Sequence, residues 1–265
     1  MVDLNKEQEA QYNKIMSKVN LSKDREIISE HAINLSKCMV NLSKHNDIDL
    51  GGQVARVITL LDYSGSMISL YKDGTIQKTL DKLMPIGLSF DDNGEIEMYI
   101  FSDTDMELPV LTINNYSDYQ TSVIGKSSMC MTGTQYCQAL KSVFKNTGKY
   151  KIMKRNTGLI SKIKGEKADT GENVFVIFIT DGEPSDKIST KLIVDKSSNA
   201  NVFIQFIGIG NNDFRYLQAL ADFGDRKINN IGFADMGDLR TVRDEKLYNT
   251  ILSNFSKWLK EKGKK

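Results

Sequence analysis

The chain has 265 residues, a formal net charge of +1 and 40% hydrophobic residues. These values suit a globular protein with one large α/β domain and an added element, and the balanced charge argues against nucleic acid or a membrane as the main partner. Three cysteines are too few for a disulfide framework, and no apolar run reaches the roughly 18 residues of a membrane-spanning helix. Because the charged N-terminus shows no signal peptide, we expect a cytoplasmic protein.

Histidine is scarce, and this narrows the possible chemistry. The sequence contains only His31 and His45, both in the N-terminal segment, and we expect both at solvated helical positions. Ser-His-Asp, Cys-His and histidine-ligated zinc sites all need a histidine at the working loop. Most hydrolase mechanisms are therefore disfavoured.

Residues 1–50 are predicted to form a helical N-terminal extension. A pentapeptide of the form (Val/Ile)-Asn-Leu-Ser-Lys recurs at residues 19–23, 33–37 and 40–44, so its leucines fall on nearly one helix face. This stripe could belong to a short interaction helix, but we favour a helix that packs on its own domain. The linker-like residues 45–52 then lead into a second unit, residues 51–265.

From residue 55 onward, apolar strands alternate with amphipathic helices. We predict strands at 55–61, 95–101, 110–113, 173–180, 201–208 and 230–234, and helices near 76–88, 136–144, 214–222 and 247–259. Pro85 should kink its helix or end the first part of it. This alternation predicts a doubly wound α/β fold with a mostly parallel sheet, in which ligands bind at the carboxyl ends of the strands.

Three loops at that edge of the predicted sheet are rich in oxygen ligands. The first carries Asp62, Ser64 and Ser66; the second carries Thr132 and Thr134; the third carries Asp181, with Glu183 and Asp186 beyond it. Each loop alone is readily explained as a turn or a helix cap. Together, and without histidine or thiolate, they indicate a site for Mg²⁺, Ca²⁺ or Mn²⁺. Hydroxyls outnumber acids, which leaves charge on the ion for a partner's carboxylate.

The same residues carry a family resemblance. The segments Asp62-Tyr63-Ser64-Gly65-Ser66, Gly133-Thr134 and Thr180-Asp181-Gly182 resemble the metal-ion-dependent adhesion site of von Willebrand factor A (vWA) domains. Residues 80–92, 203–210 and 254–259 further resemble the TerF-like group of tellurite-resistance proteins. The resemblance spans roughly residues 53–260. It implies a Rossmann-like sheet with one antiparallel edge strand, and a protein that binds rather than catalyses.

The resemblance also implies a role for each site residue. Ser64, Ser66 and Thr134 would coordinate the ion directly, whereas Asp62 and Asp181 would act largely through water. We choose Thr134 over Thr132 because it lies next to the start of a helix. The expected function is Mg²⁺-dependent capture of a partner protein that offers Asp or Glu, in a tellurite- or stress-resistance system.

Two other functions stay open. A Mg²⁺-dependent phosphoesterase or phosphotransferase could use Asp62 as its nucleophile, although Ser64 stands where such enzymes place a second Asp. The basic segment 145–167 could bind nucleic acid, but Tyr150 is its only aromatic residue, so base stacking lacks support. We expect a solvated helix or loop there. Cys130 and Cys137 flank the second loop and are expected to be buried.

Overall fold

A six-stranded sheet forms the centre of the protein, which we describe from a computed structural model covering residues 4–19, 25–155, 169–222, 226 and 228–264. The strands are β1 (Ala55–Asp62), β2 (Ile96–Phe101), β3 (Asp105–Leu111), β4 (Asn173–Thr180), β5 (Val202–Ile209) and β6 (Ile231–Gly237). Their order across the sheet is β3-β2-β1-β4-β5-β6. Within the described residues, β3 alone runs antiparallel to its neighbour. The predicted doubly wound fold with one antiparallel edge strand is therefore confirmed.

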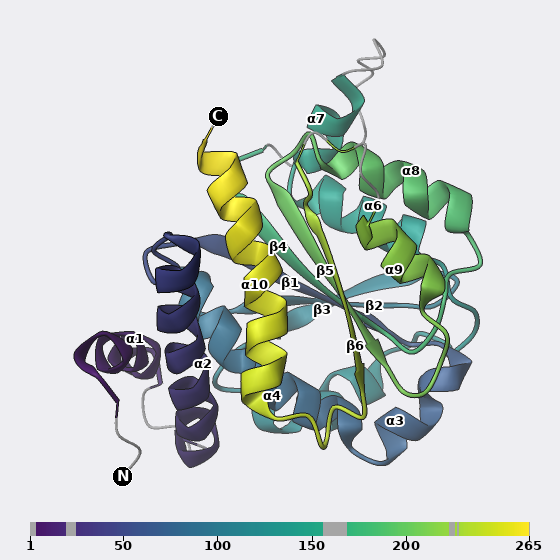
Figure 1. The fold of residues 1–265 in the computed structure, drawn as a ribbon. Helices are drawn as coiled ribbons and strands as arrows, with labels where there is room; N and C mark the ends of the chain where they lie inside the picture. Colours follow the sequence, from purple (N-terminus) through teal and green to yellow (C-terminus); the bar gives the residue numbers. More distant parts are fainter. Residues whose placement is uncertain (1–3, 20–24, 156–168, 223–225, 227, 265) are drawn as a thin grey trace.

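Helices cover both faces of this sheet (Figure 1). One face packs against α4 (Thr75–Phe90) and α10 (Asp244–Gly263), with α1 (Lys6–Ser17) and α2 (Arg25–Asn46) outside them. The other face packs against α6 (Tyr136–Asn146), α7 (Lys149–Arg155), α8 (Lys187–Ser197) and α9 (Arg215–Asp222). The short helices α3 (Ile68–Lys72) and α5 (Tyr119–Ser122) lie in connecting segments. No helix in the described part of the chain is long and apolar enough to span a membrane.

The central strands are apolar throughout because both of their faces are buried. In β4, Phe175, Ile177 and Ile179 pack toward α4 and α10. The alternate residues Val174, Val176 and Phe178 pack toward α6 and α8. This arrangement is typical of parallel strands sandwiched between helical layers, and it holds the strand ends rigidly in place.

The N-terminal helices share the core of the domain. Leu35 and Leu42 of the repeated pentapeptide are buried in the same cluster as α4 and α10, which confirms packing on the chain's own domain. The first pentapeptide falls largely outside the described residues. His45 is exposed as expected, but the expectation was wrong for His31, whose Nδ1 lies 2.6 Å from Asp244 Oδ2 at the contact of α2 with α10. The division of the chain near residue 50 stays a prediction.

Three further expectations need correction. The helix α4 continues through Pro85, so it does not end there, because buried side chains on both sides of the proline hold it against the core; the alternative of a kink stays a prediction. The strand β3 begins at Asp105, five residues before the expected start, and its edge position leaves it with a weak apolar pattern. Cys137 is buried in α6, but Cys130 is exposed because it lies in an irregular segment before the second loop.

Candidate metal centre

The centre of the site lies at the carboxyl ends of β1 and β4, the two middle strands. Leu61 pairs with Ile179 in the sheet register, so the next residues, Asp62 and Thr180, lie side by side. The chain passes from β1 to β2 on one side, whereas β4 and β5 lie on the other. This is the topological switch point at which open α/β sheets bind their ligands.

Asp62 is the buried base of the first loop. Its side chain is fully buried, and its Oδ1 accepts a hydrogen bond of 2.8 Å from the backbone N–H of Ser64. Its Oδ2 accepts a hydrogen bond of 2.6 Å from the Thr180 hydroxyl. The turn that Asp62 closes brings the hydroxyl oxygens of Ser64 and Ser66 to within 3.0 Å of each other.

The third loop joins this cluster through Asp181. The Ser66 hydroxyl donates to Asp181 Oδ1 over 2.8 Å, so residues far apart in the sequence share one hydrogen-bonded chain. Asp181 is 4% exposed, and its backbone carbonyl accepts a hydrogen bond from the Asn212 side chain in the loop after β5. The structure thus brings together four of the five predicted ligands.

The second loop lies beside the first. Thr132 forms an isolated parallel bridge with Ser64, and its carbonyl accepts a hydrogen bond of 3.0 Å from the backbone N–H of Gly65. Its hydroxyl donates to the Ser102 hydroxyl over 3.0 Å. The half-buried Thr134, by contrast, has no hydrogen-bond partner for its hydroxyl among the described residues, and its carbonyl is bound by Ser185. The Thr134 hydroxyl therefore has no competing hydrogen bond among the described residues, whereas the Thr132 hydroxyl could coordinate an ion only while it donates to Ser102.

Both carboxylates are held in surroundings that disfavour their negative charge. Burial raises the pKa of Asp62 to about 6, and the charge of Asp181 adds to this, while hydrogen bonds from Thr180 and Ser64 act in the opposite direction. Burial also raises the pKa of Asp181, against the hydrogen bond from Ser66. No cationic side chain in the described part of the chain contributes to either shift. A divalent cation would supply the missing positive charge.

The spacing of the oxygens fits such an ion. Octahedral Mg²⁺ with bonds of about 2.1 Å places neighbouring ligand oxygens about 3.0 Å apart. The Ser64–Ser66 and Ser66–Asp181 oxygen pairs are separated by 3.0 and 2.8 Å. Among the described residues, no three His, Cys, Asp or Glu side chains are grouped to hold a metal. An ion here would therefore need ligands besides these carboxylates, and the neighbouring hydroxyls are available for that role.

Three supporting side chains, of which Thr180 and Tyr136 are buried and Tyr71 is half-buried, were not predicted from the sequence as site residues. Besides holding Asp62, the Thr180 hydroxyl accepts a hydrogen bond of 2.8 Å from the Tyr136 hydroxyl. The Tyr71 hydroxyl donates to the backbone carbonyl of Asp62 over 2.9 Å. Thr180 lies within the motif quoted above, which was the available signal, but both tyrosines have the pattern of ordinary core residues.

The other acids of the third loop have structural roles. The Asp186 carboxylate accepts hydrogen bonds of 3.1 and 2.9 Å from the backbone N–H groups of Tyr136 and Cys137, at the start of α6. Glu183 accepts a hydrogen bond from the backbone of Tyr216 and pairs with Lys187. Both acids thus tie helices to the loop and do not join the oxygen cluster.

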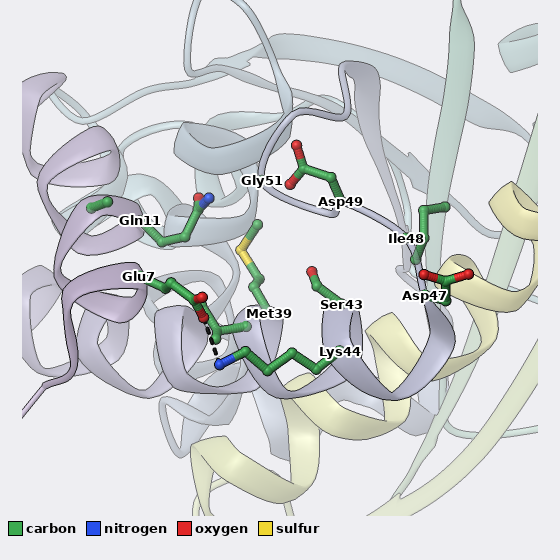
Figure 2. A pocket seen from close by; sticks show the side chains of 11 residues that line it. Glu7, Gln11, Met39, Ser43, Lys44, Asp47, Ile48, Asp49 and Gly51 are labelled. Atoms are coloured by element: carbon green, nitrogen blue, oxygen red, sulfur yellow. Dashed lines mark ion pairs between the residues drawn. The ribbon is translucent and has the colours of Figure 1, made fainter.

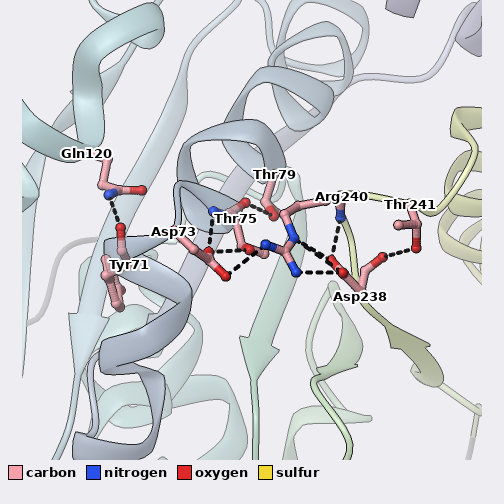
Figure 3. A network of polar contacts seen from close by, with 8 residues as sticks. All are labelled: Tyr71, Asp73, Thr75, Thr79, Gln120, Asp238, Arg240 and Thr241. Carbon is pink, nitrogen blue, oxygen red and sulfur yellow. Dashed lines mark hydrogen bonds and ion pairs between the residues drawn. The ribbon is translucent and has the colours of Figure 1, made fainter.

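An ion-pair network joins two more loops at this edge of the sheet (Figure 3). The Arg240 guanidinium lies 2.9 Å from Asp73 Oδ2 and also contacts both carboxylate oxygens of Asp238. The other oxygen of Asp73 accepts hydrogen bonds from the N–H and hydroxyl of Thr75, at the start of α4. The turn between α3 and α4 is thereby connected to the segment after β6.

The basic segment is described only in part. Residues 156–168, which carry much of its charge, lie outside the described residues. Lys149 is fully buried; its Nζ lies 2.5 Å from Asp169 Oδ1 and donates to the carbonyl of Glu172 over 2.7 Å. Lys149 is therefore unsuited to contact a phosphate backbone.

A separate hollow of about 520 Å³ lies between α1, the end of α2 and the loop that follows (Figure 2). Its lining includes Gln11, Ser43 and Asp49, together with the ion pair of Lys44 and Glu7, whose Nζ and Oε2 atoms are 2.6 Å apart. None of the predicted metal ligands lines it. It lies in the N-terminal helical region and is distinct from the candidate metal centre.

The chain is similar to a protein from Bacillus subtilis and to several proteins of known structure. Against the uncharacterized protein YcbR of Bacillus subtilis (strain 168), the chain is 30% identical over 215 residues, which are 80% of each protein. The structure of proximal thread matrix protein 1 from the mussel byssus matches 77% of this chain and 48% of its own, with a TM-score of 0.53 and 17% identity. A manganese-loaded Plasmodium vivax TRAP structure covers 78% of this chain and 75% of its own, at a TM-score of 0.49 and 19% identity.

The family assignment comes from a match to residues 54–265, which are most of the chain. The matching family is vWA-TerF-like, described as the vWA found in the TerF C terminus. The matched region begins just before β1 and includes all six strands and the three loops of the candidate metal centre. The chain therefore belongs to the vWA-TerF-like family.

Proposed function

We propose that this domain recognises a partner protein through a divalent metal ion held by Asp62, Ser64, Ser66, Thr134 and Asp181. The observation that carries the proposal is the convergence of the Ser64, Ser66 and Asp181 oxygens, from two separate loops, into one cluster next to the buried Asp62. The two buried carboxylates beside it lack a cationic partner among the described residues, which supports the same interpretation.

The five residues would divide the work of holding the ion. The hydroxyls of Ser64, Ser66 and Thr134 would be direct ligands, and Asp62 and Asp181 would act largely through water. Mg²⁺ suits such a set because it keeps exchangeable waters, and Ca²⁺ or Mn²⁺ are the alternatives. Thr180 would keep the Asp62 carboxylate in position throughout.

The partner would offer an Asp or Glu side chain. Neutral hydroxyl ligands leave much of the cation's charge uncompensated, and the exposed Ser66 puts that charge within reach of solvent. A binding role also suits Asp62 better than catalysis. Its carboxylate is fully buried and both of its oxygens accept hydrogen bonds, so it is poorly placed to attack a phosphate ester.

The wider setting that we propose is a tellurite- or stress-resistance system in the cytoplasm. Its support is the family description, which refers to TerF. The relative in Bacillus subtilis is itself uncharacterized, so it adds no function. The partner is accordingly defined by its chemistry, as a protein with an accessible carboxylate.

The test compares the wild-type chain with Asp62→Ala and Ser66→Ala. Calorimetry should show Mg²⁺ binding that both variants lose, and pull-downs with Mg²⁺ should recover a partner that excess chelator releases. Ser66→Ala is included because Ser66 is exposed, so its loss should leave the fold intact. The control is Asp92→Ala, which removes an exposed acid at the opposite edge of the sheet. Normal partner capture by Asp62→Ala in excess chelator would show that the proposal is wrong.

A further inference from the structure

The outer face of α8 carries an unusual pair of apolar side chains. Ile188 is 80% exposed and Leu192 is 56% exposed, whereas no other large hydrophobic residue in the described chain exceeds 46%. The two residues are four positions apart, so they lie next to each other on the helix surface. Single exposed apolar residues are common, but adjacent ones form a patch, and patches mark interaction sites.

The patch continues into a groove of about 200 Å³ between α6, α7 and α8. Leu192 lines one side of this groove and Tyr150 is also part of the lining. The nearly buried side chains of Cys137, Met153 and Ile193 complete its apolar surface. An apolar side chain from a partner could therefore lie beside Leu192 and be largely removed from water.

The groove also carries positive charge that no described carboxylate neutralises. Lys141 and Lys196 line it, and no carboxylate lies within ion-pair distance of either in the described part of the chain. Two other lysines of α8 differ, since Lys187 pairs with Glu183 and Lys191 pairs with Asp195 at 2.7 Å. The apolar surface is thus bordered by two lysines whose charge can meet that of an acidic partner.

We propose that Ile188, Leu192 and the adjoining groove dock an acidic amphipathic helix of a partner protein. Such a helix would place two leucine-sized side chains, one turn apart, against the Ile188–Leu192 ridge and into the groove. Its flanking Asp or Glu residues would face Lys141 and Lys196. A second copy of this chain is a poorer occupant, because a two-fold contact through the same surface would bring like-charged lysines together.

This docking surface is independent of the metal centre. Its residues come from α6, α7 and α8, which cover one face of the sheet (Figure 1), and none of the predicted metal ligands lines the groove. Binding there should therefore survive excess chelator and the Asp62→Ala substitution. Loss of metal binding would test the proposed function, and loss of helix binding would test this inference.

The experiment uses the full chain and a library of stapled helical peptides. Each peptide carries leucine at two positions one turn apart, with Glu, Lys or Ser at the flanking positions. Selection should enrich the Glu-rich peptides, and the affinity of a selected peptide is then measured by fluorescence anisotropy. Ile188→Ser and Leu192→Ser should each weaken binding about tenfold or more. Ile27→Ser, which removes a 46% exposed residue of α2, is the matched control and should bind normally.

The charge of the groove is tested separately. The double variant Lys141→Glu/Lys196→Glu should lose most binding and most of its dependence on salt, whereas Lys257→Glu on the exposed face of α10 should not. No enrichment above background, enrichment without preference for Glu, or normal binding by Leu192→Ser would each overturn the proposal. Self-association of the wild-type chain that Leu192→Ser abolishes would also overturn it, because the occupant would then be a second copy.

Discussion

The Thr180 hydroxyl donates a hydrogen bond of 2.6 Å to Asp62 Oδ2, and both residues are fully buried. Thr180 ends β4 and Asp62 ends β1, so two neighbouring strands fix the orientation of one carboxylate. The backbone of Ser64 holds the other oxygen of that carboxylate. The base of the candidate metal centre is therefore preorganised by the neighbouring strand as well as by its own loop.

Replacing this threonine by an isosteric apolar residue should loosen the site. We expect Thr180→Val to lower the free energy of unfolding by about 1–2 kcal/mol, because buried groups lose their hydrogen-bond partner. Mg²⁺ affinity measured by calorimetry should fall about tenfold, as for other residues that support metal ligands.

Thr59 offers a matched control for that substitution. It is also a fully buried strand threonine, but its hydroxyl has no hydrogen-bond partner in the described chain. Thr59→Val should therefore leave stability unchanged or raised, with Mg²⁺ affinity intact. Equal affinities for Thr180→Val and Thr59→Val would contradict a supporting role for Thr180.

The second loop gives a test of which threonine binds the ion. Thr134→Val should weaken Mg²⁺ binding at least tenfold, because it removes the hydroxyl that has no hydrogen-bond partner among the described residues. Thr132→Val should remove the hydrogen bond to Ser102 but have little effect on affinity, because the proposed ligand is Thr134. Calorimetry measures the Mg²⁺ affinity of both variants. The reverse order of affinities would assign the ligand to Thr132.

The raised pKa of Asp62 predicts a pH dependence of stability. Its value is about 6 in the metal-free protein, against about 4 for an unfolded Asp, so the folded state retains a proton in the window between them. Unfolding therefore becomes easier as the pH rises from about 4 to 7, by up to about 3 kcal/mol from this group. Asp62→Asn should remove that dependence in urea titrations.

A proton and a metal ion compete for Asp62. Stabilisation of the fold by Mg²⁺ should therefore increase as the pH rises, whereas the stability of the metal-free protein decreases. The stabilising effect of Mg²⁺ should be small at pH 5 and should grow as the pH passes 6, because binding to the folded state alone raises stability. Melting temperatures with and without Mg²⁺ at pH 5 and pH 8 provide the measurement. A Mg²⁺-induced shift that is the same at both pH values would be inconsistent with a role for Asp62.

Asp244, at the contact between α2 and α10, should give the opposite dependence of stability on pH. Burial alone would raise the pKa of Asp244, but the hydrogen bond and charge of His31, with help from Asn34 and Lys82, lower it below its ordinary value. A carboxylate with a lowered pKa stabilises the fold above about pH 4, and this contribution is lost as the pH falls through the folded value.

The substitution Asp244→Asn should therefore destabilise the protein at pH 7 by about 1–3 kcal/mol. At an acidic pH below the lowered pKa of folded Asp244, its unfolding free energy should approach that of the wild type, because the wild-type carboxyl group is then uncharged as well. Urea denaturation at the two pH values checks this, with the exposed Asp92→Asn as control. A difference that stays constant even below the pKa of folded Asp244 would show that the ion pair is not its source.

Much of the architecture could be predicted from local patterns. The strand over residues 173–180 is found at its predicted limits, since an apolar run with a sharp polar end has one plausible extent. The exposed and half-buried edge strand β3 has no such pattern, and its limits were missed. Pro85 does not end its helix, because a packed helix can continue where an isolated one would break.

The oxygen-rich loops could also be found in the sequence, because each follows a strand or precedes a helix. Both histidines lie far from these loops along the chain, so the residue types in the loops already favour oxygen ligands at the candidate centre. The sequence does not indicate which hydroxyls are already in use. The roles of Thr180 and Tyr136 and the difference between Thr132 and Thr134 emerge only from contacts across the sheet.

By itself, then, the sequence determined the α/β class, the edge where the site lies and the kinds of atoms available there. Those properties follow from local apolar periodicity and residue type. Only the tertiary structure decided that Ser66 bonds Asp181, 115 residues away, and that Thr180 bonds Asp62, 118 residues away. Such contacts depend on the order and register of the strands, which arise from packing of the whole domain and leave no local pattern.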